Sequence, residues 1–252
     1  MIGDARTLGT EPRRPRLLPR SAAGRELAVV LSRRRALAIK AGLPLALAVV
    51  LVAGRAPTFW AGMLLTVLVA MVGAVGTAVT VSRAREAGFL TRLAATPGSR
   101  PRLLLGWVMA AAAVDVLQLL PVAVAAWLSG GGGVAGLVVL VAALTATLVV
   151  TNVLGCLITL AAANAAEVLL DVVVLLAPLL YLGGLFTGVP ADGWRAIVAA
   201  ADPFSHLQSA FIGVLGGTAT YAGGVDVLAV LGAALVATAA LAGLSRRVLE
   251  RD

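Results

Sequence analysis

Residues 134–163 read VAGLVVLVAALTATLVVTNVLGCLITLAAA, an apolar stretch that contains no charged side chain. A helix rises about 1.5 Å per residue, so about 20 residues cross the hydrocarbon core of a bilayer, which is about 30 Å thick. This stretch is long enough to cross, and it is apolar on every side. It therefore predicts a membrane-spanning helix rather than the core helix of a soluble domain.

Five further apolar runs of similar length lie on either side of this stretch. We therefore predict an all-α, polytopic membrane protein with six transmembrane helices. The spans form one domain, 21–252, which follows a disordered basic tail at 1–20. We expect the spans at 36–54, 59–82, 103–128, 134–163, 167–186 and 225–244.

The overall composition supports a membrane location. Hydrophobic residues make up 60% of the chain and charged residues 13%, whereas a soluble domain is about half apolar and about a quarter charged. The surplus apolar surface must face lipid or another protein chain. The single cysteine, Cys156, excludes an intrachain disulfide, and the single histidine, His206, has no partners of metal-binding type, so we predict no metal site.

The net charge of +8 comes from basic residues that cluster between the apolar runs. Ten of the twenty basic residues precede residue 41, five lie between Arg83 and Arg102, and three lie between Arg246 and the C-terminus. Six spans place these clusters on one side, which predicts that both termini are cytoplasmic. We expect a bacterial plasma membrane, from the Arg-, Ala- and Val-rich composition, and no nucleic-acid partner.

The loop between the second and third runs carries the most informative pattern. Phe89, Leu90 and Leu93 form an apolar stripe at helical spacing. Ser82 is placed to cap the start of this helix, and Thr-Pro-Gly at 96–98 is placed to end it. The pattern predicts a short amphipathic helix on the cytoplasmic side, attached at both ends to transmembrane helices, so that its movement would move both spans.

The order of residues in this loop resembles the cytoplasmic motif of the type-2 ABC exporter permeases. It reads Glu-x-Gly-x-Leu-x-x-Leu-x-x-Thr-Pro from residue 86 to residue 97. In that family the motif forms the coupling helix, which docks on the ATPase subunit. By this resemblance, the residues that couple the chain to an ATPase are Glu86, Gly88, Phe89, Leu90, Arg92, Leu93, Thr96 and Pro97.

A second resemblance to the same family follows the fifth apolar run. In the family, an outer segment forms short helices that dip back into the membrane before the last span. The residues that match it here are Pro178, Gly183, Gly184, Phe186, Pro190, Trp194 and Pro203.

The resemblance implies the membrane-spanning permease subunit of an ATP-driven ABC exporter, which moves a drug-like, antibiotic or lipid cargo out of the cytoplasm. The sequence contains no GxxxxGK[ST] phosphate loop. ATP and Mg are therefore expected in a separate ABC ATPase subunit, and this chain is expected to be a transport subunit without a catalytic site or a cofactor of its own. The resemblance also implies a dimer with a second permease copy or a paralogue, surrounded by membrane lipid.

Asp115 and Gln118 lie three residues apart within the third apolar run. An ionisable group at such a depth is costly and usually faces the interior of a helix bundle. Two interpretations stay open: the pair lines the translocation path, or Asp115 is a hydrogen-bonded group at a helix contact. Asn152 in the fourth run is predicted to bond between helices.

An ion-coupled secondary transporter is the alternative function, with Asp115, Glu167 and Asp171 as the intramembrane carboxylates. Glu167 and Asp171 also suit the positive end of a helix dipole at the start of the fifth run. A membrane scaffold without transport activity is a third possibility. We expect His206 on the outer side, at the surface or at an interface.

Overall fold

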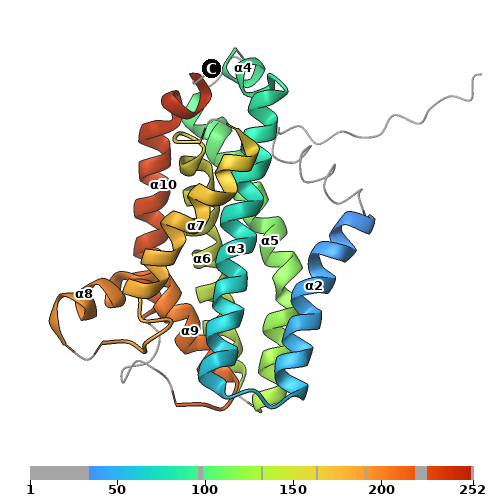
Figure 1. Cartoon of the computed structure of the whole chain (residues 1–252), viewed down its shortest axis with the longest axis vertical. Coiled ribbons are helices and arrows are strands. Elements are labelled where there is room, and N and C mark those ends of the chain that lie inside the picture. Colours follow the sequence, from blue (N-terminus) through green and yellow to red (C-terminus); the bar gives the residue numbers. More distant parts are fainter. Residues whose placement is uncertain are drawn as a thin grey trace, which may run out of the picture.

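The computed structural model describes residues 34–95, 99–131, 133–162, 164–190, 192–218 and 226–250. Most of these residues lie in helices, and none of them forms a strand. In Figure 1 the long helices form a bundle, with the short helix α4 at the same end as the C-terminus and with α9 at the opposite end. The predicted basic tail at 1–20 lies outside the described residues. The helices are α2 (Arg34–Ala53), α3 (Thr58–Glu86), α4 (Phe89–Ala94), α5 (Arg100–Gly130), α6 (Val134–Ile158), α7 (Ala165–Leu182), α8 (Gly193–Ala201), α9 (Pro203–Val214) and α10 (Val227–Glu250).

Helix α6 lies at the centre of the bundle and contacts α3, α5, α7, α9 and α10. Its sequence has no polar face, so neighbouring helices can bury it from several directions. Leu140, Leu144 and Leu148 are fully buried, in a cluster with Leu65 of α3 and Phe211 of α9. The outermost helix, α2, packs mainly along α5 (Figure 1).

Four helices, α3, α5, α6 and α10, are long and apolar enough to cross a membrane. The two remaining predicted spans do form helices, but both are shorter. The described apolar part of α2 runs over Ala41–Ala53, and α7 has 18 residues, with Glu167 in its first turn. The all-helical, multi-pass character is confirmed, and the count of six spans stays a prediction.

Several helix ends differ from those that hydrophobicity predicts. Helix α3 continues past Ser82 to Glu86, α10 continues past 244 to Glu250, and α6 ends at Ile158 rather than at 163. Polar side chains at the ends of spans do not stop a helix, because the backbone there can hydrogen-bond to water or to other side chains.

The backbones of α3 and α6 come very close where they cross. A Cβ added to Gly155 of α6 would lie 2.3 Å from the carbonyl oxygen of Ala74 in α3, and a Cβ added to Gly73 would lie 2.0 Å from Thr151 Oγ1. Small residues at such crossings let membrane helices approach and make dense van der Waals contact.

The crossing predicts that Gly155→Ala destabilises the protein. The new methyl group would collide with backbone, which cannot rotate away, at a cost of about 1–3 kcal/mol. Thermal unfolding of the purified protein in detergent measures the effect. Gly76→Ala in α3 is the control, because a Cβ there meets nothing within 4 Å and should be neutral or stabilising by about 0.5–1 kcal/mol. Equal melting temperatures for the two variants would contradict this account of the crossing.

Candidate functional site

The short helix α4 lies between the two long helices α3 and α5, as the sequence predicts, but it begins later. Ser82 is buried within α3 rather than at a helix start. Helix α3 ends at Glu86, and Gly88, with φ of +65°, turns the chain. Glycine adopts this left-handed conformation without the clash that a Cβ would cause, which makes it the common residue after a helix end. Glu86 therefore belongs to the end of α3, and α4 starts at Phe89.

Arg92 fastens α4 to the end of α3. Its guanidinium group donates hydrogen bonds to the carbonyl oxygens of Ala87, at 3.0 Å, and of Gly88, at 3.3 Å. The last carbonyls of a helix lack partners within the helix, and a basic side chain satisfies them and favours the negative end of the dipole. The two helices are thus joined by side-chain bonds as well as by the two-residue turn.

The apolar side chains of α4 join it to a buried cluster and to an aromatic side chain of α5. Leu90 is 2% exposed, in a cluster with Val153 and Cys156 of α6 and Val248 of α10. The Phe89 ring lies 6.2 Å from the ring of Trp107 in α5, yet it stays 38% exposed. Leu90 is thus buried in the cluster, while Phe89 lies at its edge beside Trp107, which packs against the same cluster. Thr96, Pro97 and the Leu93 side chain lie outside the described residues.

Arg85 forms a second link that the sequence gave no signal for. It donates from Nη2 to the carbonyl oxygen of Thr159, at 2.7 Å, and from Nη1 to that of Ala162, at 3.5 Å. These carbonyls lie just after the end of α6. Arg85 thereby bonds the end of α3, at which the motif of residues 86–97 begins, to the end of the central helix α6.

The outer segment after α7 folds as two short helices joined at Asp202. Gly184 and Gly188 have φ of +81° and +82°, and they turn the chain between α7 and α8. Arg195 then attaches α8 to the end of α7, donating to the carbonyl oxygen of Tyr181 at 3.2 Å and lying 4.8 Å above the Tyr181 ring. Trp194 is 65% exposed, so α8 presents an aromatic side chain outward.

Helix α9 lies between α3 and α6 and is buried except at Gly213. Pro203 occupies its first turn, where a missing N–H costs nothing. Phe204, Leu207 and Phe211 are almost fully buried. Of the other residues that match the family's outer segment, Pro178 lies inside α7, Gly183 follows its end, and Phe186 is 46% exposed. Pro190 follows the Gly188 turn and precedes α8.

A family model described as ABC-2 type transporter matches residues 23–215. The chain belongs to the ABC-2 type transporter family. The match covers α2 through α9 and thus both α4 and the outer segment. No curated protein and no solved structure matches the chain. Membership makes the chain a membrane transport component, in a family whose permeases work with ABC ATPase partners.

In this ABC-2 type transporter, Asp115 joins a hydrogen-bonded row across three helices. Asn152 of α6 donates to Asp115 Oδ2 of α5 at 3.0 Å, and Thr77 of α3 donates to Asn152 Oδ1. The geometry fits the interpretation of Asp115 as a bonded group at a helix contact, and it confirms that Asn152 bonds between helices. Gln118 is buried, and its Nε2 has no hydrogen-bond partner among the described residues.

Polar side chains cap the starts of α7 and α10. Asp226 caps α10, accepting from the N–H groups of Leu228 and Ala229 at 2.9 and 3.1 Å. Asn164, rather than Glu167, caps α7, while Glu167 lies in the first turn, where its charge favours the helix dipole.

His206 is not a surface residue. It is 2% exposed in α9, with Nε2 2.8 Å from the carbonyl oxygen of Ala200 and Nδ1 accepting from the N–H of Asp226 at 3.3 Å. A carbonyl can only accept, so Nε2 carries the proton and the ring is neutral in this arrangement. The histidine connects α9 to the residues before it and to the start of α10.

Asp202 lies between α8 and α9, outside the spanning helices, and the pKa of its buried carboxyl is raised. Its Oδ1 accepts from the N–H of Phe204 and its Oδ2 from Ser205 Oγ, both at 3.1 Å. Ser205 Oγ also lies 2.7 Å from the Gly183 carbonyl oxygen. Burial raises the Asp202 pKa from 3.8 to about 7, against the lowering effect of these hydrogen bonds. Asp followed by Pro before an apolar helix is an N-cap signal that the sequence does contain.

The raised pKa predicts a stability that depends on pH. The folded state holds the proton more tightly than the unfolded state, so the contribution of Asp202 is complete in acid and is lost as pH rises from about 4 to about 7. The melting temperature should therefore fall between about pH 4 and pH 7, and Asp202→Asn, which stays neutral, should flatten that fall. A variant with the same pH profile as the unmodified protein would show that Asp202 does not titrate in this range.

Proposed function

We propose that this chain is the permease subunit of an ATP-driven ABC exporter, with α4 as the coupling helix that docks on a separate ATPase subunit. In this proposal α2 and α7 complete six spans, both termini are cytoplasmic, and two permeases pair in the bacterial plasma membrane. ATP and Mg bind in the ATPase. The cargo is an amphipathic drug-like molecule, an antibiotic or a lipid.

The arrangement of α4 is the observation that carries the proposal. A six-residue helix at one end of the bundle is attached to the end of α3 by Arg92, to α5 by the Phe89–Trp107 ring contact, and to α10 by the cluster that contains Leu90 and Val248. A force applied to so short an element reaches three long helices at once. Glu86, Thr91 and Arg92 remain exposed around it, which leaves a polar surface for a partner.

The distribution of charged and aromatic residues supports a cytoplasmic location of α4. Arg83, Arg102 and Arg246 lie exposed at its end of the bundle, as the positive-inside rule expects of cytoplasmic segments. Trp60 and Trp194, which are 52% and 65% exposed, belong to the opposite end, and amphipathic aromatic rings favour the membrane–water interface.

In the proposed cycle, ATP-driven closure of the ATPase pair displaces α4. The Arg92 bonds pass the displacement to α3, and the Arg85 bonds pass it on to α6. Coupling then works as a shift between two arrangements of the bundle that bind the ATPase differently.

The docking role predicts that Glu86→Arg weakens binding of the ATPase. Reversing an exposed charge at a docking surface disfavours association while leaving the buried helices intact. Tagged protein is purified in mild detergent and the co-purifying ATPase is quantified. Asp192→Arg is the matched control, since it makes the same reversal at an exposed position beside α8. If ATPase recovery is unchanged for Glu86→Arg, or falls equally for both variants, α4 is not the docking element.

The hydrogen-bonded row at Asp115 favours a second candidate, an ion-coupled secondary transporter. A carboxylate that accepts from Asn152, which in turn accepts from Thr77, lies between three long helices and could exchange a proton or hold a cation. The two functions differ in what they require of this residue, because only ion coupling needs its charge.

Substitution of Asp115 therefore separates the two candidates. Asn at 115 still accepts a hydrogen bond from Asn152, so the exporter proposal predicts near-normal transport for Asp115→Asn. Asp115→Leu should lose that bond, with a cost of about 0.5–1.5 kcal/mol. Transport is measured in vesicles with and without ATP. Loss of transport in Asp115→Asn, in protein that melts normally, would favour ion coupling instead.

A further inference from the structure

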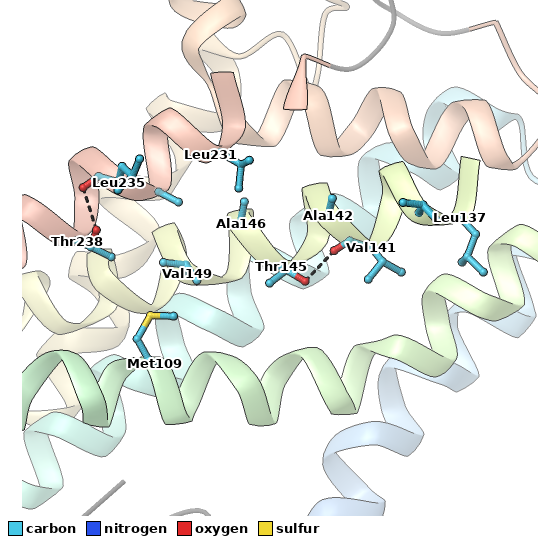
Figure 2. Close-up of a pocket in the computed structure, with 12 residues that line it drawn as sticks. Met109, Leu137, Val141, Ala142, Thr145, Ala146, Val149, Leu231, Leu235 and Thr238 are labelled. Atoms are coloured by element: carbon cyan, nitrogen blue, oxygen red, sulfur yellow. Dashed lines mark hydrogen bonds between the residues drawn. The ribbon is translucent and has the colours of Figure 1, made fainter. Parts of the chain in front are cut away.

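An elongated apolar groove lies between α6 and α10, with Met109 of α5 near one end (Figure 2). Its volume is about 850 Å³. The groove exists because Ala142, Ala146 and Ala234 present small side chains where the two helices face each other, while Leu137, Leu231 and Leu235 stand along its length. Neither the α4 site nor the outer segment contributes to its lining.

The groove offers nothing to a polar ligand. Its two hydroxyl groups bond to their own helices: Thr145 donates to the carbonyl oxygen of Val141 at 2.7 Å, and Thr238 donates to that of Leu235 at 2.9 Å (Figure 2). The remaining lining side chains are apolar. A polar group placed here would lose its hydration without gaining a hydrogen bond, so the occupant has to be a hydrocarbon.

The length of the groove matches one leaflet of a bilayer. Along α6 the lining runs from Leu137 to Val149, which is about 18 Å at about 1.5 Å per residue. Half of the hydrocarbon core is about 15 Å. The lining begins three residues after the start of α6 at Val134, so the groove extends from one membrane face toward the bilayer centre, parallel to a lipid chain.

The groove is continuous with surface that the described part of the chain leaves exposed. Val138 and Leu235, which line the groove, are 62% and 70% exposed. Only 11% of the most apolar 18-residue stretch of α10 is buried. In a multi-pass membrane protein, acyl chains are the apolar molecules that such a surface meets first.

We propose that this groove binds one acyl chain of a phospholipid from the leaflet in which α6 begins. The chain lies lengthwise against Ala142 and Ala234 and is enclosed by Leu231 and Leu235. This inference depends on the membrane location of α6 and α10 and not on the proposed exporter function. Where that function also holds, the lipid supports α10, whose other end packs against Leu90 of α4.

The test uses the full-length protein reconstituted in vesicles of phosphatidylethanolamine and phosphatidylglycerol that contain a small fraction of phospholipid with a photoactivatable diazirine in the acyl chain. After irradiation, mass spectrometry assigns adducts to residues. We expect adducts on Met109, Leu231 and Leu235 to exceed several-fold those on Leu228 and Val236, which are exposed on α10 outside the groove. Equal labelling of both sets would overturn the proposal, because it would indicate contact with bulk lipid and no bound acyl chain.

A groove-filling variant gives the second arm of the test. Ala142→Leu with Ala234→Leu should reduce the groove adducts several-fold, while Ala240→Leu, at an exposed position of α10 that does not line the groove, should leave them unchanged. Unaltered labelling in the filled groove would overturn the proposal. A second copy of the chain as the occupant would also overturn the proposal. In that case the unmodified protein would show no lipid adducts in the groove, and a variant with cysteines at positions 138 and 235 would cross-link two copies. If the double variant does not fold, the comparison within the unmodified protein still decides.

Discussion

The close crossing of α3 and α6 is the constraint on which the rest of the bundle depends. With no side chain on Gly155, the backbone of α6 rests on the Ala74 carbonyl, and within the same turns Thr77, Asn152 and Asp115 satisfy one another. Lipid supplies no water for unpaired polar groups, so they must find partners inside the protein. The other faces of α6 then accept α5, α7, α9 and α10. A change at this crossing would displace all of them together.

The helical, multi-pass architecture could be predicted from sequence because a bilayer permits few alternatives. Four of the predicted spans meet the length and hydropathy of a crossing. Helix ends were harder to place, since hydropathy marks where lipid ends and not where hydrogen bonding ends. At the end of α6, Arg85, which is 74 residues away in sequence, donates a hydrogen bond to the carbonyl oxygen of Thr159. No local pattern contains that information.

The candidate site was predictable where its chemistry is apolar. Leu90 is buried as its spacing indicates, whereas the position of Phe89 beside Trp107 depends on a tertiary ring contact that its spacing does not show. Arg92 belongs to the motif that the resemblance marks, but neither its bonds to Ala87 and Gly88 nor those of Arg85 to the end of α6 could be predicted, because arginines are common at the cytoplasmic ends of spans for reasons of topology alone. Of the two expectations for His206, a surface position was wrong for a related reason. A lone histidine in a polar-looking connection suggests exposure, but the connection folds back as a buried helix.

Burial of α9 has a consequence for the route by which any molecule could cross. The helix fills the space between α3 and α6 and also touches α5, and Phe204, Leu207 and Phe211 leave almost none of their surface accessible. A densely packed interior has no room for a solute without large rearrangement. In the arrangement described here, the axis of a single bundle is therefore closed near the end opposite α4. A transported molecule would then have to move along the outer surface of the bundle, with lipid or a neighbouring subunit on its other side.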